Sequence, residues 1–222
     1  MTTQTETQAV TAAVSALQAE SAFLITGEGT EPVAPGVWIL HGQGNSIVFL
    51  LDTGLVVVDS GPGGRVTAGM IAALRKVSDA PIHAICFSHG HLGYNSGLSQ
   101  WLAHARERGD DAPRCIAHAN LLRRATRYAQ TMPLQERMAG IQFRRASGAM
   151  AGKFPVAFPT ETFTDRLLLG DRNGRHVELL WAPSETDDCL AVWDAQQGLL
   201  YGGPAIIDSI PNLGTPFRTQ RD

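Results

Sequence analysis

The sequence predicts one α/β domain built on mixed β-sheets, and three observations support this. Short β-branched runs separated by tight turns dominate the first part of the chain. Two segments with helical spacing flank a strand that is apolar on both faces. No glycine-rich phosphate loop follows the first strand, which argues against a doubly wound parallel fold. The 222 residues are 44% hydrophobic and 18% charged, which is ordinary for a globular domain.

The chain is expected to divide into an extension over residues 1–30 and a domain over residues 31–222. Within the extension, residues 8–23 carry apolar side chains near helical spacing and predict an amphipathic helix for packing or oligomer contact. The runs 36–40, 46–51 and 55–59 then predict three consecutive antiparallel strands, because "GQGN" and "DTG" separate them as tight turns.

The middle of the chain alternates helix and strand. Residues 63–77 place apolar side chains on one helical face, and residues 95–109 predict a second helix. Between them, "PIHAICFS" over residues 81–88 predicts a strand buried on both faces. A further strand is expected at 114–119, followed by helical spacing over 119–148.

The last part returns to strands. Residues 155–170 predict a loop that leads into a strand. The segments "HVELLWA", "CLAVWDA" and "GLLYGG" predict three more strands, with a turn at "AQQG". Strands that follow one another in this way, after the alternating part, favour mixed sheets.

Composition limits the functional classes. The formal net charge of −3, without a long basic run, argues against a nucleic-acid partner. No apolar segment reaches the roughly 18 residues needed to cross a membrane, and the N-terminus lacks the features of a secretory signal. Three cysteines (Cys86, Cys115 and Cys189) argue against a disulfide framework. We therefore expect a cytoplasmic protein that acts on a small molecule.

The stretch "SHGHLGYNSG" at residues 88–97 contains the first candidate site. His89 and His91 are two positions apart at the end of an apolar strand, so both imidazoles can reach one ion at zinc–nitrogen distances of about 2.0–2.1 Å. The alternative is that both are loop histidines hydrogen-bonded to the backbone. The preceding strand and the helix that follows favour the metal site.

A carboxylate and a polar loop are the other candidates. Asp59 ends the strand in "VVVDSG" and either orients a metal-ligand histidine or makes an Asx turn. The loop "APSETDDC" at residues 182–189 offers Glu185, Asp187, Asp188 and Cys189 as donors. The alternatives are a loop whose acids cap turns, and a cysteine that is a small buried core residue.

Taken in this order, these elements resemble the metallo-β-lactamase superfamily. "VVVDSG" resembles its first motif, and "SHGHLGYNSG" resembles its His-x-His-x-Asp-His motif. "CIAHANLLRRATRYAQT" and "ETDDCLAVWDAQQGLLYGGPAIIDSIPNLGTP" are similar to the alkylsulfatase-like branch. The resemblance runs from about residue 35 to the end. It implies a four-layer αββα sandwich in which two zinc ions bind a bridging hydroxide, and this hydroxide attacks an ester, lactam, thioester or sulfate ester.

The resemblance also implies a reduced metal site. His89 and His91 match the first two ligands of the first metal, whereas Gly93 and Tyr94 stand where the second metal has an aspartate and a histidine. Pro204 stands where the family has a metal-bridging aspartate. The second metal thus loses each of these side-chain ligands.

In the later loop, Glu185 stands where most branches have the third histidine of the first metal, and Cys189 where the alkylsulfatase-like branch often has histidine. We therefore expect at most one zinc ion, held by His89, His91 and Glu185 with Cys189 as a further donor. Three protein ligands and a water form a viable catalytic zinc site.

Three functions remain open. The first is a mononuclear hydrolase of ester-like or sulfate-ester substrates, with Asp59 as orienter and Tyr94 as a partner of a substrate oxygen or as an acid. The second is a metal-free binding or regulatory homologue, in which Tyr94 only fills the emptied site. The third is a metal-independent lyase or isomerase that uses Tyr94 and a histidine.

Three further features of the sequence are less informative about function. The chain ends before the family's last helix, strand and further histidine, so either it is a fragment or a second copy or a partner chain covers the open side. His118 could approach the cleft from the next strand end. The arginines of 123–127 and Arg144 with Arg145 either form a solvated face or bind an anionic group.

Overall fold

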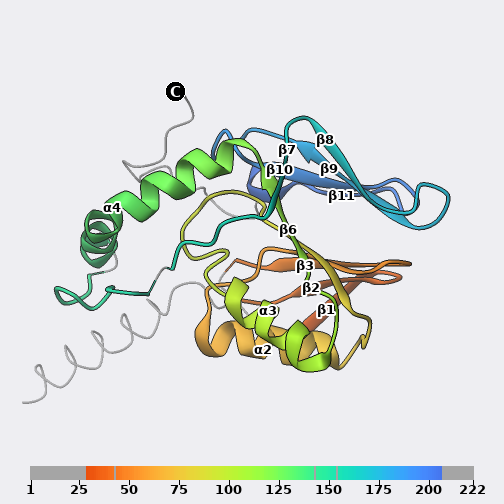
Figure 1. Cartoon of the computed structure of the whole chain (residues 1–222), viewed down its shortest axis with the longest axis horizontal. Helices are drawn as coiled ribbons and strands as arrows, with labels where there is room; N and C mark the ends of the chain where they lie inside the picture. Colours follow the sequence, from red (N-terminus) through yellow and green to blue (C-terminus); the bar gives the residue numbers. More distant parts are fainter. Residues whose placement is uncertain (1–28, 43, 143, 154, 207–222) are drawn as a thin grey trace, which may run out of the picture.

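Two β-sheets lie face to face, and helices cover the outer face of the larger one (Figure 1). The structure is a computed structural model that describes residues 29–42, 44–142, 144–153 and 155–206. The helix expected at residues 8–23 and the end of the chain lie outside these residues. The α/β class is confirmed, and of the two sheets the larger one is mixed.

The larger sheet has seven strands in chain order, and the direction of pairing changes at its centre. Pairs from β1 to β4 are antiparallel, as the tight turns predict for β2 to β4, and pairs from β4 to β7 are parallel. The strands are β1 (Thr30–Ala34), β2 (Val37–Leu40), β3 (Ser46–Leu51), β4 (Gly54–Val58), β5 (Ile82–Cys86), β6 (Arg114–His118) and β7 (Glu161–Phe163). Because β4, β5 and β6 are parallel, their carboxyl ends meet at one edge of the sheet.

The smaller sheet is antiparallel, with the strand order β11-β10-β9-β8. Its strands are β8 (Arg166–Gly170), β9 (His176–Trp181), β10 (Leu190–Asp194) and β11 (Leu199–Tyr201). The single strand expected within 155–170 is in fact two short strands, β7 and β8, which belong to different sheets. The turn between them, at residues 164–165, carries the chain from one sheet to the other.

Strand β4 shows why the larger sheet is buried on both faces. Val56 and Val58 face the smaller sheet and join the core between the two sheets. Leu55 and Val57 point the other way, toward the helices. All four side chains are fully buried. This alternation follows from the two-residue period of a strand and places helices, a large sheet and a small sheet in three successive layers.

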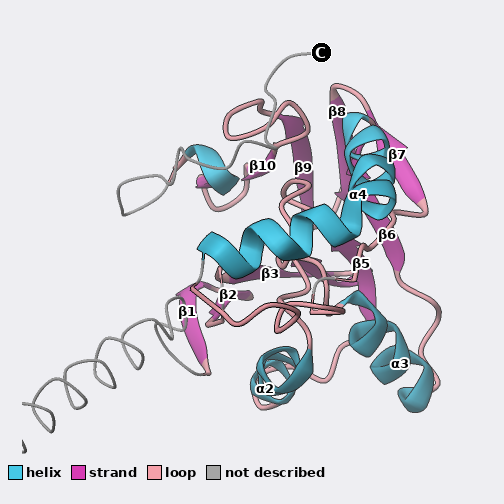
Figure 2. Cartoon of the chain, turned by 90° about the vertical axis from the view of Figure 1, so that its left-hand side faces the viewer, coloured by secondary structure: helices cyan, strands magenta, loops and turns pink. Residues whose placement is uncertain are grey.

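Three helices complete the described fold: α2 (Gly64–Arg75), α3 (Leu98–Arg108) and α4 (Asn120–Gln142). A 3₁₀ turn, η1 (Gly203–Ala205), follows β11. Helix α4 bends at Thr131, whose backbone is not helical, two residues before Pro133. Figure 2 shows its two segments meeting at an angle. No helix among the described residues has the length and apolar character needed to cross a bilayer.

Of the four layers expected, the described residues form three. None of their α-helices covers the outer face of the smaller sheet (Figure 1). Leu200, which lies opposite Trp193 on that sheet, is 51% exposed. The inner face is closed, because Leu179, Leu190 and Val192 are fully buried against the larger sheet.

Candidate metal centre

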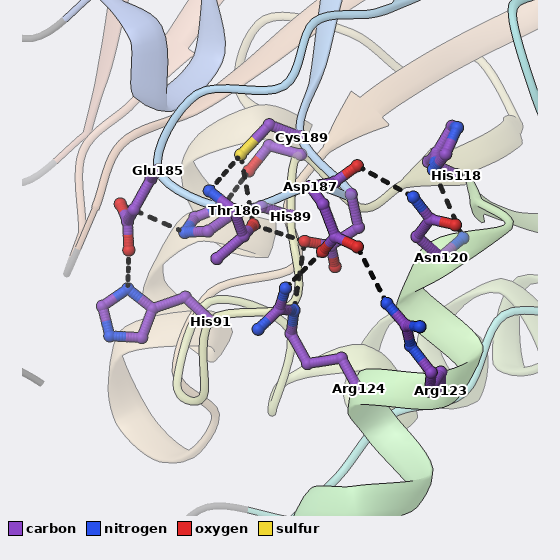
Figure 3. A network of polar contacts seen from close by, with 12 residues as sticks. His89, His91, His118, Asn120, Arg123, Arg124, Glu185, Thr186, Asp187 and Cys189 are labelled. Carbon is purple, nitrogen blue, oxygen red and sulfur yellow. Dashed lines mark hydrogen bonds and ion pairs between the residues drawn. The ribbon is translucent and has the colours of Figure 1, made fainter. Parts of the chain in front are cut away.

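His89, His91 and Glu185 come together at the edge where the parallel strands end. Nε2 of His89 lies 3.7 Å from Oε2 of Glu185, and Nδ1 of His91 lies 3.3 Å from Oε1. One donor atom from each residue lies within 4.8 Å of the others, and no other such group of three His, Cys, Asp or Glu occurs among the described residues. Figure 3 shows both rings facing the carboxylate. The convergence expected of these three residues is therefore present.

The two sheets supply the two halves of this group. The histidines follow β5 of the larger sheet, and Glu185 lies in the loop between β9 and β10 of the smaller one. A backbone hydrogen bond joins the halves, because the N–H of Leu190 donates to the carbonyl of Ser88 at 2.9 Å. His89 is buried, whereas His91 and Glu185 are each about a quarter exposed. The group is therefore fixed on one side and open on the other.

Asp59 acts on His89 through Ser88. The Asp59 carboxylate accepts hydrogen bonds from the backbone N–H of Ser88 at 2.8 Å and from its hydroxyl at 2.5 Å. The side-chain amide of Asn95 donates to the same carboxylate at 2.7 Å. The hydroxyl of Ser88 also lies 2.8 Å from Nδ1 of His89. Asp59 is thus linked to the histidine loop through Ser88 and Asn95, whose part in this arrangement is not evident from the sequence.

Burial governs the ionisation of Asp59. The side chain is 2% exposed, and this desolvation raises the pKa of its carboxyl to about 6 despite the hydrogen bonds from Ser88 and Asn95, which act in the opposite direction. The residue also has a left-handed backbone, with φ of 66°. Such a conformation is uncommon outside glycine and is held here by the surrounding hydrogen bonds.

Tyr94 lies against both histidines. Its ring centroid is 4.7 Å from that of His89 in an edge-on arrangement and 5.0 Å from that of His91 in a stacked one. A Cβ atom at Gly44 would collide with the same ring, so the glycine gives Tyr94 its room on that side. Gly93 has φ of 96°, a backbone conformation that favours glycine. The turn that brings Tyr94 to the histidines thus depends on Gly93 for its backbone.

Cys189 does not join the group. Its sulfur accepts from the backbone N–H of Thr186 at 3.3 Å and lies 3.2 Å from the hydroxyl of that residue. The thiol is fully buried. Its position matches the alternative of a small buried core cysteine, which here closes the loop that carries Glu185.

His118, the other histidine considered for the cleft, makes its contacts elsewhere in the fold. His118 stacks on Trp181, and its Nε2 lies 2.7 Å from the carbonyl of Thr164. The backbone N–H of Asn120 donates to its other ring nitrogen at 3.3 Å, so both nitrogens are used within the fold. Pro204 lies in η1, after β11.

The acids that follow Glu185 bind arginines of α4. Asp187 accepts from Arg124 and, at 3.1 Å, from Arg123. Asp188 accepts from Nε of Arg124 at 3.2 Å. These arginines are therefore neither a wholly solvated face nor a free anion site, and their pairing with the acids is not evident from the sequence.

A small cavity lies beside the histidine loop on the helix side. Its lining includes His91 together with apolar side chains of Leu121, Ala125 and Val156. The cavity measures about 30 Å³, which is room for one or two water molecules.

Comparison with known proteins identifies the same architecture. Residues 40–108 match the model of the metallo-β-lactamase superfamily. The chain is 27% identical over 187 residues to a linear primary-alkylsulfatase of Pseudomonas sp. (strain ATCC 19151), with 74% of this chain and 35% of that protein covered.

Solved structures share the fold. The stereoselective inverting sec-alkylsulfatase of Pseudomonas sp. superposes with a TM-score of 0.59 at 16% identity, covering 79% of this chain and 31% of that one. A metallo-β-lactamase family protein of Thermus thermophilus gives 0.58 at 18% identity, covering 87% and 64%. The chain spans about a third of the length of these alkylsulfatases.

Proposed function

This chain has the metallo-β-lactamase fold and resembles the alkylsulfatases of that superfamily in sequence, and we propose that it is a metal-dependent hydrolase of small molecules. In this proposal His89, His91 and Glu185 hold a single zinc ion, and the substrate is an ester-like or sulfate-ester compound.

The spacing of the three donor residues carries the proposal. Ligand atoms that lie about 2.1 Å from one tetrahedral ion are separated from each other by about 3.4 Å. The two nitrogen–oxygen separations here are 3.3 and 3.7 Å, each to a different oxygen of Glu185, and one donor atom from each residue lies within 4.8 Å of the others. Two imidazoles and one carboxylate are also a donor set that zinc accepts at catalytic sites, where a fourth position stays open. The residues present therefore fit the ion.

Each residue of the centre has a defined task. When bound, zinc supplies Lewis-acid chemistry that polarises a substrate and makes water a nucleophile near neutral pH. Asp59 and Ser88 hold the proton of His89 at Nδ1, which leaves Nε2 as the donor atom on the side of Glu185. The exposed sides of His91 and Glu185 form the face that the substrate approaches.

Tyr94 accounts for the limit of one ion. Its ring packs on both histidines, next to Gly93, where the family has ligands of a second metal. We propose that the main role of Tyr94 is to fill the space that a second metal ion would occupy. Its hydroxyl remains a candidate partner for a substrate oxygen.

Metal analysis of the purified chain tests the proposal. We expect about one zinc ion per chain, lost on dialysis against a chelator together with hydrolysis of aryl ester or alkyl sulfate probes. His89→Ala should abolish stoichiometric zinc, whereas His83→Ala should retain it, because His83 lies near the start of β5, at the far end of that strand from the site. A wild-type chain that binds no zinc from a buffer containing excess metal would refute the proposal.

The packing of Tyr94 also supports two metal-independent alternatives. A ring that fills the place of an ion suits a binding or regulatory homologue without catalysis. A phenol in contact with two imidazoles suits a lyase or isomerase that uses them as acid and base. Turnover that resists chelation would favour the second, and a chain with neither zinc nor turnover would favour the first.

A further inference from the structure

Arg124 of α4 connects the two loops that form the centre. Its side chain is 4% exposed and pairs with both acids that follow Glu185. Nε donates to Asp188 at 3.2 Å, and Nη2 donates to Asp187. Figure 3 shows the guanidinium between α4 and the loop. A buried arginine with two carboxylate partners has a fixed orientation, since its planar fork offers several donors at once.

The same side chain also presses on the histidine loop. A Cβ atom built on Gly90 would lie 2.5 Å from Cδ of Arg124 and 2.6 Å from Oδ2 of Asp188. Gly90 stands between the two histidines, so the Arg124–Asp188 pair packs directly against the backbone that presents them. The absence of a side chain at Gly90 is what permits this approach.

Further bonds link this pair to the loop that carries Glu185. The hydroxyl of Thr186 donates to Asp188, which is fully buried. The carbonyl of Asp187 accepts from Asn120 of α4 at 3.1 Å and from Nε1 of Trp181 at 2.8 Å. Residues 186–188 are therefore held on α4 at several points, and Glu185 extends from their beginning.

We propose that Arg124 is a positioning residue of the centre: by binding Asp187 and Asp188 while it packs on Gly90, it sets the separation between Glu185 and the histidine pair. This inference rests on the proposed function, since the separation matters for one shared ion. It also gives Arg124 a role other than binding an anionic substrate, because its charge already faces two carboxylates.

Two variants and a control test this role. Arg124→Lys keeps the charge but loses the fork, and Arg123→Met removes the neighbouring arginine, whose side chain is 57% exposed and also pairs with Asp187. We expect Arg124→Lys to weaken zinc binding at least tenfold in competition with a chromophoric chelator, and Arg123→Met to stay within threefold of the wild type. Wild-type affinity in Arg124→Lys would overturn the inference.

A third variant separates positioning from folding. Removing one partner of a buried ion pair can prevent folding, so the combined change Arg124→Met with Asp188→Asn removes both charges of that pair, while Asp187 keeps Arg123 as its partner. If it folds with a wild-type melting temperature, zinc affinity should still fall at least tenfold. Unchanged affinity in that variant would reduce Arg124 to a purely structural residue and reject the proposal.

Metal-free crystal structures distinguish failure of this inference from failure of the proposed function. In Arg124→Lys the Glu185 carboxylate should move away from Nδ1 of His91, and in Arg123→Met it should stay in place. This comparison needs no bound zinc, so it decides the role of Arg124 even if the wild-type chain proves unable to bind the metal. An unmoved Glu185 in Arg124→Lys would contradict the inference.

Discussion

The hydroxyl of Ser88 lies 2.8 Å from Nδ1 of His89 and also binds the carboxylate of Asp59, and from these two contacts we infer the tautomer of the buried histidine. A serine hydroxyl has one proton, and here it points to the ionised carboxylate of Asp59. Ser88 can then only accept from His89, so the imidazole carries its proton on Nδ1. The lone pair of Nε2 consequently faces Glu185, where a metal ligand is needed.

Ser88→Ala should weaken zinc binding by about 10- to 100-fold, the range found when partners of metal-bound histidines are removed. The backbone bond from residue 88 to Asp59 remains, so the loop should keep its fold. Competition with a chelator measures the affinity. Ser96→Ala is the matched control, because its hydroxyl bonds to the carbonyl of Pro155 instead. Equal affinities in both variants would show that the tautomer is fixed in another way.

Asp59 should make the metal-free protein less stable as the pH rises from about 4 to 6. Burial raises the pKa of this carboxyl from 3.8 to about 6, so the folded state binds the proton more tightly than the unfolded state does. The proton therefore adds about 3 kcal/mol to the free energy of unfolding below pH 4. This contribution is lost as the pH rises to 6 and above. Urea unfolding of the wild type and of Asp59→Asn across this window isolates the effect. A constant difference between the two would contradict the assignment.

Tyr94→Phe should keep both zinc affinity and hydrolysis within about threefold of the wild type, because filling requires the ring and not the hydroxyl. Tyr94→Ala should lower the free energy of unfolding by about 2 kcal/mol, since a half-buried ring is lost. Steady-state kinetics and urea unfolding provide the measurements. A loss of turnover of about 100-fold in Tyr94→Phe, with zinc still bound, would instead identify the phenol as an acid.

Gly93→Asp restores the acid expected in the family but should not restore a second metal. The backbone at this position has φ of 96°, so any side chain there costs about 1–3 kcal/mol. Thermal unfolding and zinc stoichiometry check both parts. Gly69→Ala on the exposed face of α2 is a suitable control, because nothing lies within 4 Å of its added Cβ and helix propensity favours alanine. Two zinc ions in Gly93→Asp would contradict this account.

Most elements of the fold follow from local patterns, and the exceptions have physical reasons. The antiparallel strands β2 to β4 and the buried strand β5 lie where β-branched runs place them. Strand β1 was not predicted, because Pro32 interrupts it; a proline is tolerated there since β1 is an edge strand. The split of residues 155–170 into β7 and β8 depends on which sheet each half joins, and that choice involves partners far away in the sequence.

The candidate site likewise contains some residues that the sequence predicts and others that it does not. His89, His91 and Glu185 could be predicted, since their motifs and order resemble a known family. Cys189 was a plausible donor by chemistry, yet its thiol bonds to Thr186. The role of Arg124 could not be seen, because its partners lie about 64 residues further along the chain. For Ser88 the sequence does offer one signal, because a hydroxyl residue that stands directly before a candidate ligand histidine can hydrogen-bond to its ring.

One backbone bond has a wider consequence for how this centre can be altered. The link from the N–H of Leu190 to the carbonyl of Ser88 uses main-chain atoms on both sides. Any replacement except proline at position 190 leaves both atoms in place, so this link joins the bases of the two loops while the side chains above it set the finer geometry. The scaffold is therefore well suited to redesign, in which new donor sets or an entirely apolar pocket are installed while the frame beneath them stays unchanged.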